Sequence, residues 1–293
     1  MAEAGDGGAL ARAVLTEAAL EAVRAHPAFP QASLAVMIAW APHSDDDRAL
    51  ARVVRDLGQY ICAVWAMQLY VSPGGLTHAS LSRLLAPLGV ATRTRVHAIL
   101  AYLRFSGLIR PTAEQADGRS KTFEPTPALR RLFKARFRRE LETCRWMGPQ
   151  VAAALDRWEE PGVFEAVVAA HGRLFGSALE GRDPSQPNLD VFSNRNAGLT
   201  ILGQVMRQAC PDGRFPPKGP VRLSIAEIAR EAGVSRAHAH NVLKAGRAAG
   251  MLDMTEDGLA SFPPLLVEHL TNLLAASFVN LAWAAQEACG DDS

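Results

Sequence analysis

The sequence contains little that would support catalysis or a covalently braced scaffold. It has only four cysteines in 293 residues, and no two of them lie at C-x-x-C spacing. This sparse use of cysteine argues against a disulfide framework or a zinc knuckle. The G-x-x-x-x-G-K-[ST] phosphate loop, the H-E-x-x-H pattern and a convincing nucleophile elbow are also missing. We therefore expect a protein that is not an enzyme, with no catalytic residues, no bound metal and no cofactor.

The first residues lack a basic segment followed by an apolar core, so we expect no export signal and a cytoplasmic location. Near the other end, residues 269–286 carry no Asp, Glu, Lys or Arg, which is a feature of membrane spans. Polar side chains such as Thr271, Asn272 and Asn280 interrupt this stretch. We expect a buried or dimer-forming helix there and no contact with a membrane.

Neither sign of charge is in clear excess over the whole chain, but the net charge of +1 hides an uneven distribution along the sequence. Residues 77–147 carry 14 basic and 5 acidic groups, whereas 1–76 carry 5 and 8 and 148–293 carry 12 and 17. Within the last segment, residues 213–250 carry 7 basic and 2 acidic groups. Two basic zones between acidic segments are typical of a nucleic-acid-binding protein.

Both basic zones contain the same pattern of residues. Segments 80–90 (SLSRLLAPLGV) and 224–234 (SIAEIAREAGV) have apolar residues at helical spacing, so each predicts a helix that starts at its serine. Each ends at a glycine, Gly89 or Gly233, which suits a left-handed turn. Beyond these turns the two zones match at an offset of 143 residues, which pairs Arg93 with Arg236, His97 with His240, Arg104 with Arg247 and Gly107 with Gly250.

A second helix follows each turn, with Thr92 or Ser235 as its expected N-cap. The apolar stripes have i, i+3, i+4, i+7 spacing and consist of Val96, Ile99, Leu100 and Leu103 in the first copy, and Ala239, Val242, Leu243 and Gly246 in the second. The opposite faces carry small or polar side chains, which allow a helix to enter a major groove. The expected DNA contacts are Thr92, Arg93, Thr94, Arg95 and His97 in the first copy, and Ser235, Arg236, His238, His240, Asn241 and Lys244 in the second.

A short two-stranded hairpin is expected after each second helix. The first turns at Asp117-Gly118, a strong hairpin signal, and its tip carries Arg119 and Lys121, which suit phosphate or minor-groove contact. The second turns at Asp257-Gly258 and carries Glu256 and Asp257 instead. We expect the first hairpin to contact DNA and the second to stay off it or to meet protein.

The histidines of the second copy and the basic run 130–139 also need to be weighed as possible binding residues. His238 and His240 are two residues apart, so on a helix they point about 200° apart and cannot share one metal ion. The basic run 130–139 has little acid to balance it, so it could contact phosphates, form a solvated helix face or bind a partner.

The first basic zone, with its helix-turn-helix LTHASLSRLLAPLGVATRTRVHAILAYLRFSGLI and charged hairpin, resembles the MarR-type winged helix-turn-helix transcriptional regulators over about residues 45–147. The second is similar to a generic bacterial winged-helix domain over about residues 189–288. The resemblance implies DNA binding through the second helix of each pair.

We predict a mainly α fold with short β-wings, formed by two tandem winged helix-turn-helix domains with long flanking helices. The expected domains are an N-terminal helical extension at 1–44, the first winged unit with a helical extension at 45–180, a linker at 181–188 and the second unit at 189–293. Long helices are predicted at 45–71, 189–209 and 264–288.

The favoured function is sequence-specific binding of double-stranded DNA as a bacterial transcriptional regulator. A plasmid-type replication initiator and a winged-helix protein-interaction adaptor are the alternatives. A homodimer through the long helices is a further expectation, and the sequence points to no particular effector molecule.

Overall fold

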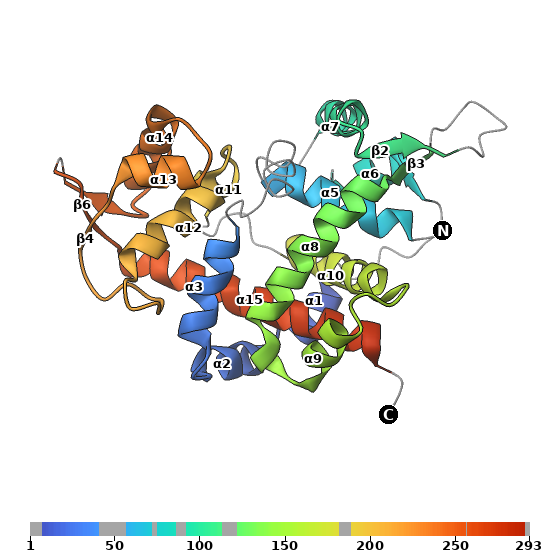
Figure 1. The fold of residues 1–293 in the computed structure, drawn as a ribbon, viewed down its shortest axis with the longest axis horizontal. Helices are drawn as coiled ribbons and strands as arrows, with labels where there is room; N and C mark the ends of the chain where they lie inside the picture. Colours follow the sequence, from blue (N-terminus) through green and yellow to red (C-terminus); the bar gives the residue numbers. More distant parts are fainter. Residues whose placement is uncertain are drawn as a thin grey trace. The chain divides into compact units, whose positions relative to one another are not determined.

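The structure is a computed structural model that describes residues 8–40, 57–71, 75–85, 92–112, 122–181, 189–255 and 257–290. In these ranges the chain is mainly helical, with fourteen α-helices, one short 3-10 helix and two small antiparallel sheets (Figure 1). The predicted mainly helical class with short strands is confirmed. The chain forms two compact units: unit 1 comprises residues 1–19, 58–184 and 279–293, and unit 2 comprises residues 20–57 and 185–278.

This division differs from the linear one that the sequence suggested. Helix α3 (Phe29–Ala39) belongs to unit 2 instead of to a separate extension at 1–44. Helix α15 (Pro264–Cys289) contributes its residues from Val279 onward to unit 1. Both differences arise because apolar helix faces pack against partners that are distant in sequence. The expected linker at 181–188 does contain a boundary between the units.

Unit 1 places one small sheet among helices and has Trp65, Phe133 and Phe137 fully buried in its core. Strand β3 lies between β1 and β2 and is antiparallel to both. The elements in chain order are α1 (Ala9–Val14), α5 (Leu57–Tyr70), β1 (Leu76–Thr77), α6 (His78–Leu85), α7 (Arg93–Phe105), β2 (Ile109–Pro111), β3 (Thr122–Pro125), α8 (Pro127–Thr143), the 3-10 helix η1 (Arg145–Met147), α9 (Pro149–Asp156) and α10 (Val163–Glu180).

Helix α6 starts earlier than the sequence predicted. We expected Ser80 to begin it, but the helix begins at His78. The N–H of Ser80 donates to the hydroxyl of Thr77 at 2.9 Å, and the N–H of Thr77 donates back to the hydroxyl of Ser80 at 2.8 Å. This reciprocal pair satisfies two amides at the helix start in the manner of a capping box, so Thr77 takes the role that we gave to Ser80.

Unit 2 has an equivalent sheet in which β6 lies between β4 and β5 and is antiparallel to both. Its buried core includes Met37, Phe192, Phe215 and Phe278. The elements are α2 (Glu17–Ala25, shared at its start with unit 1), α3, α11 (Asp190–Ser193), α12 (Gly198–Ala209), β4 (Val221–Arg222), α13 (Ile225–Glu231), α14 (Arg236–Ala248), β5 (Asp253–Met254), β6 (Leu259–Ser261) and α15 up to Phe278.

The continuous helix predicted at 189–209 is wrong, because the chain turns between α11 and α12. Ala197 adopts φ +53°, the left-handed region in which a helix cannot continue. The backbone of Gly198 then passes so close to Phe192 that a β-carbon would lie 2.0 Å from the Phe192 carbonyl oxygen. Only glycine fits there, and the tight turn lets Phe192 reach the core.

The long helix predicted at 264–288 is confirmed as α15. Of the helices in the described ranges, α15 is long and apolar enough to cross a membrane by length and composition, but half of its most apolar window is buried inside the protein. Leu266, Leu270 and Leu274 are fully buried, and Phe278 meets the ring of Phe29 edge-on at 6.0 Å. The apolar stripe of α15 therefore packs within its own chain.

Candidate nucleic-acid interface

Each unit contains a pair of short helices followed by two strands, and the two copies have the same element order. In unit 1 the order is β1, α6, α7, β2 and β3, and in unit 2 it is β4, α13, α14, β5 and β6. Helices α7 and α14 both have 13 residues and begin at Arg93 and Arg236, which is the offset of 143 that the sequence predicted. The repeat in the sequence is thus a repeat in the structure.

The second helix of each pair starts with the cap that was predicted for it. The hydroxyl of Thr92 accepts a hydrogen bond from the N–H of Arg95 at 3.2 Å, and the hydroxyl of Ser235 accepts one from the N–H of His238 at 3.1 Å. Both caps satisfy an amide that has no partner within the helix. They fix the residue at which each exposed face begins.

Glycines end these helices in the same way. Gly107 and Gly250 both have φ +68°, and each donates its N–H at 3.0 Å to the carbonyl three residues earlier. Gly233, between α13 and α14, has φ +66° and so adopts the predicted left-handed turn. Its expected counterpart, Gly89, lies outside the described residues.

The buried faces of both helices are those that periodicity predicted. The buried residues are Val96, Ile99, Leu100 and Leu103 in α7, and Ala239, Val242, Leu243 and Gly246 in α14. Gly246 stands where α7 has a leucine because the ring of Phe192 fills that space. A β-carbon on Gly246 would lie 2.8 Å from this ring.

The opposite faces are exposed and cationic, and neither helix contains Asp or Glu. Arg104 and Arg247 are exposed at matching positions near the helix ends; the offset paired them, but we had not counted them as contacts. The predicted contact residues that are exposed are Thr92, Arg93, Thr94, Arg95, His97, Ser235, Arg236, His240, Asn241 and Lys244.

His238 is placed differently from the other predicted contacts. It is half-buried, and its Nε2 lies 2.8 Å from the backbone oxygen of Asn196 in the turn between α11 and α12. The side chain therefore joins α14 to that turn. Because it faces protein, we leave it out of the candidate interface.

His97 has a neighbour that the sequence did not reveal. Its ring lies 5.8 Å from the ring of His78 at an angle of 62°, and the Nε2 of His78 lies 3.1 Å from the backbone oxygen of Arg93. His78 thus contacts the first turn of α7. Two histidines are too few for a metal centre, and the described part of the chain holds no group of three or more potential metal ligands.

Of the charged residues predicted at the two hairpin tips, the structure describes Asp257. Arg119, Lys121 and Glu256 lie outside the described residues. In the second hairpin the guanidinium of Arg222 holds the carboxylate of Asp257 at 2.9 Å. A hydrogen bond from Thr255 and the charge of Arg222 lower the pKa of Asp257. The anion that we expected to repel phosphate is therefore paired within its own sheet.

The basic run on α8 is also engaged by acidic partners. Lys134 and Arg138 both pair with Glu159, at 2.8 and 3.3 Å, and Arg130 pairs with Glu165. The hydrogen bond and charge of Lys134 lower the pKa of Glu159. These contacts tie α8 to the start of α10 and to the turn before it, which favours a structural role for these cations over phosphate binding.

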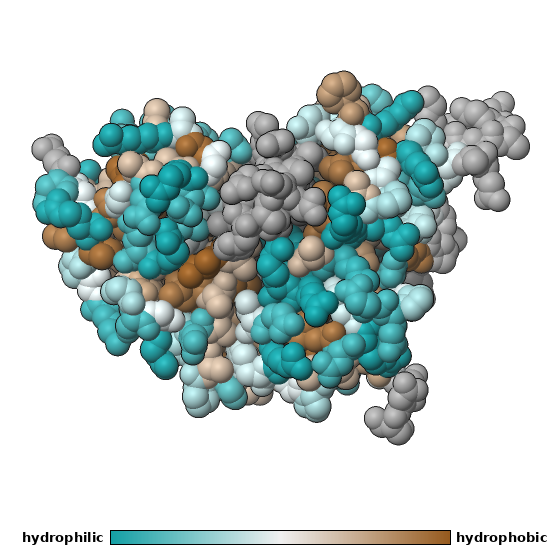
Figure 2. Space-filling view, in the orientation of Figure 1, coloured by the Kyte–Doolittle hydropathy of each residue, from teal (hydrophilic) through white to brown (hydrophobic). Residues whose placement is uncertain are grey.

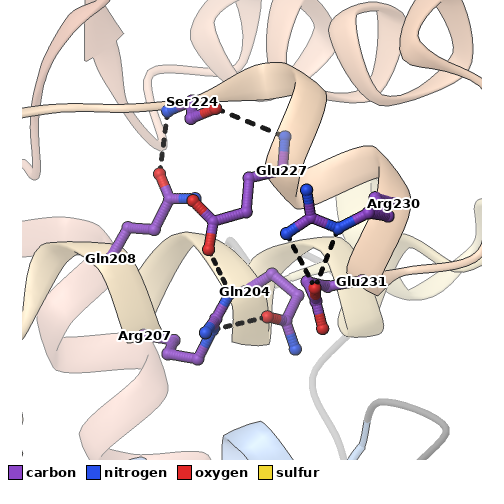
Figure 3. A network of polar contacts seen from close by, with 7 residues as sticks. All are labelled: Gln204, Arg207, Gln208, Ser224, Glu227, Arg230 and Glu231. Atoms are coloured by element: carbon purple, nitrogen blue, oxygen red, sulfur yellow. Dashed lines mark hydrogen bonds and ion pairs between the residues drawn. The ribbon is translucent and has the colours of Figure 1, made fainter.

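A polar network in unit 2 holds α13 on α12 (Figure 3). Ser224 caps α13 by accepting the N–H of Glu227 at 3.3 Å, and its own N–H donates to Gln208 at 2.8 Å. The guanidinium of Arg207 bridges Glu227 at 2.9 Å and Gln204 at 2.7 Å. Periodicity could not reveal this network, because its members come from two helices that are separated by a long loop. The network fixes the position of α13, the helix that precedes α14, on α12.

Comparison of the chain with models of protein families, with curated proteins and with solved structures gave no match.

Proposed function

We propose that the chain is a sequence-specific double-stranded DNA-binding protein and acts as a transcriptional regulator. In this proposal the two repeated segments are winged helix-turn-helix units, with α7 and α14 as recognition helices. The hairpin formed by β2 and β3 and the one formed by β5 and β6 are the wings.

One observation carries the proposal: three exposed basic residues of α7 recur at matching positions of α14. Arg93, His97 and Arg104 in α7 correspond to Arg236, His240 and Arg247 in α14, and all six are exposed. Core packing explains the repetition of the buried stripes but not that of the exposed basic residues. A repeated polyanionic ligand explains it, because successive major-groove segments of a duplex present the same phosphate geometry.

The geometry suits reading of the major groove. The capped N-terminus of each helix carries positive dipole charge, which favours approach to phosphate. Arg93 and Arg236 stand in the first turn, where recognition helices contact base edges. An arginine there can bond a guanine through two hydrogen bonds, worth about 1–3 kcal/mol of discrimination.

The test begins with selection of duplexes from a random library by the full chain. Arg93→Ala and Arg236→Ala should each weaken binding of the selected duplex by roughly 1–3 kcal/mol and relax its sequence preference. Arg145→Ala in unit 1 and Arg24→Ala in unit 2 are the controls, because both arginines lie outside α7 and α14 and are engaged elsewhere; Arg145 is exposed and Arg24 is half-buried. Failure to enrich any duplex, or equal affinity of all four variants in mobility shifts, would refute the proposal.

Occupancy across the genome then identifies the process that this binding serves. Enrichment at promoters supports a transcriptional regulator. Enrichment at a single replicon origin identifies a replication initiator instead. Absence of enrichment, together with retention of protein partners, identifies an adaptor.

A further inference from the structure

The outer face of α7 differs in chemistry from that of α14, and this difference bears on what each helix reads. We propose that α7, beyond the first-turn contact of Arg93, recognises thymine by contacting its C5-methyl group, whereas the equivalent positions of α14 read hydrogen-bonding base edges. The contact surface is the apolar stripe of α7, defined as Thr94, Ala98, Ala101 and Phe105. This inference rests on the proposed function and names the half-site that unit 1 would select.

The four residues of the apolar stripe lie on one line along the helix. Their spacing of four, three and four residues keeps them within about 60° of one another at 100° per residue. All four are exposed, and Phe105 is 89% exposed. Apolar atoms project from the surface at the position of α7 in Figure 2. The stripe is about 16 Å long, which matches about five base steps of duplex.

Phe105 is unusual for a surface residue of a small domain. It is the last residue of α7 and is more exposed than any other large apolar side chain in the described ranges. Tyr102, one turn earlier, is 39% exposed and widens the apolar surface beside it. Covering such a surface with an apolar group lowers the free energy, because apolar area is removed from water.

The second copy keeps the exposure and changes the chemistry. The positions equivalent to the apolar stripe are Ala237, Asn241, Lys244 and Ala248, all exposed. Asn suits the paired donor and acceptor of adenine, and Lys suits the acceptors of guanine. Ala, the methyl of Thr, and Phe instead suit the thymine methyl, the apolar feature of the major groove. The two helices are therefore built for half-sites of different composition.

Charge selects duplex DNA as the occupant of the apolar stripe. Arg93, Arg95 and Arg104 are exposed on α7 around it, and the helix has no acidic residue. A protein surface would have to neutralise these cations, whereas phosphates on both sides of the major groove do so directly. The arrangement of an apolar line between cations thus complements methyl groups between phosphates.

The experiment removes the methyl groups alone. In the duplex selected with the full chain, deoxyuridine replaces thymidine in one half-site at a time, and affinity is measured by fluorescence anisotropy. We expect a loss of about fourfold for each contacted methyl in the half-site bound by unit 1 and no loss in the other. Phe105→Ala should lower affinity for the unmodified duplex and reduce the sensitivity to deoxyuridine. Asn241→Ala, the matched control in α14, should keep that sensitivity.

Each other outcome has a distinct meaning. If no duplex is selected, the proposed function fails and takes this inference with it. If duplex binds but deoxyuridine has no effect in either half-site, the inference fails and the proposed function stands. If Phe105→Ala changes sedimentation and leaves the sensitivity to deoxyuridine intact, Phe105 is a contact between copies of the chain, which also overturns the inference.

Discussion

The imidazole of His171 meets the ring of Phe137 edge-on, with 5.1 Å between ring centroids and 86° between planes. Phe175 stacks on the same imidazole at 5.9 Å. Burial lowers the pKa of His171 from 6.5 to about 4; a hydrogen bond with Asn280 opposes this shift, and the charge of Arg136 adds to it. Unit 1 therefore folds around a histidine that is neutral at pH 7.

This buried histidine predicts loss of stability in mild acid. The unfolded chain takes up a proton near pH 6.5, whereas the folded chain resists it down to about pH 4, so protonation favours unfolding within that window. The free energy of unfolding should fall by about 3 kcal/mol from this group between pH 6.5 and 4 and change no further below pH 4. Urea unfolding by circular dichroism should show a shallower pH dependence for His171→Leu, or for His171→Gln as a second replacement. The same pH dependence in wild type and both variants would contradict the prediction.

Gly203 should be intolerant of a methyl group. A β-carbon there would lie 2.2 Å from the backbone carbonyl oxygen of Met37 on α3, and backbone cannot swing away. Gly203→Ala should cost about 2 kcal/mol or more, although alanine at an open helical site gains about 1 kcal/mol. Gly219→Ala is the control, because a β-carbon there meets nothing within 4 Å. Urea midpoints decide between them, and a stabilised Gly203→Ala would show that α3 does not pack this closely on α12.

The basic hairpin tip should supply phosphate contacts that the basic helix α8 does not. Changing Arg119 and Lys121 together to alanine should flatten the slope of log affinity against log salt by up to about 2, with little change in preferred sequence. The matched control changes Lys134 and Arg138, which already pair with Glu159, and should leave the slope unaltered. A salt titration on one duplex measures both. An effect confined to the α8 pair would place the anchor on α8.

The acidic hairpin tip should not be needed for DNA binding. Asp257→Ala removes an anion and releases the guanidinium of Arg222 from its ion pair. Affinity for the selected duplex should stay equal or rise slightly, since a released cation favours phosphate. Anisotropy at fixed salt measures the change. A clear loss of affinity would contradict this prediction and would show that the Arg222–Asp257 pair contributes to a DNA contact.

Two adjacent leucines of α15 should respond differently to a charge. Leu274 is fully buried, so Leu274→Glu should cost several kcal/mol and unfold the protein. Leu273 is 38% exposed, so Leu273→Glu should keep the fold. Circular dichroism and sedimentation measure both. If the exposed side of α15 joins two copies of the chain, Leu273→Glu yields folded monomers; a folded, unaltered Leu274→Glu would contradict the packing of α15.

The sequence determined those features that depend on neighbours within one or two helical turns. The buried stripe with Val96 and Leu100, the caps at Thr92 and Ser235 and the left-handed Gly233 follow from spacing and side-chain type alone. Helical geometry brings residues three and four apart onto one face, and a hydroxyl before a helix reaches an amide of its first turn. Most of the exposed face of the candidate interface was predictable for this reason.

Tertiary structure decided what depends on distant residues. No local signal pairs His238 with Asn196, Arg222 with Asp257 or Lys134 with Glu159. Each contact requires two segments that the fold brings together. The same holds for α3, which no periodicity assigns to unit 2 but which meets Gly203 backbone to backbone. The sequence thus determined which face of each helix is buried. Long-range packing determined which charged and polar groups on the exposed faces remain available to a ligand.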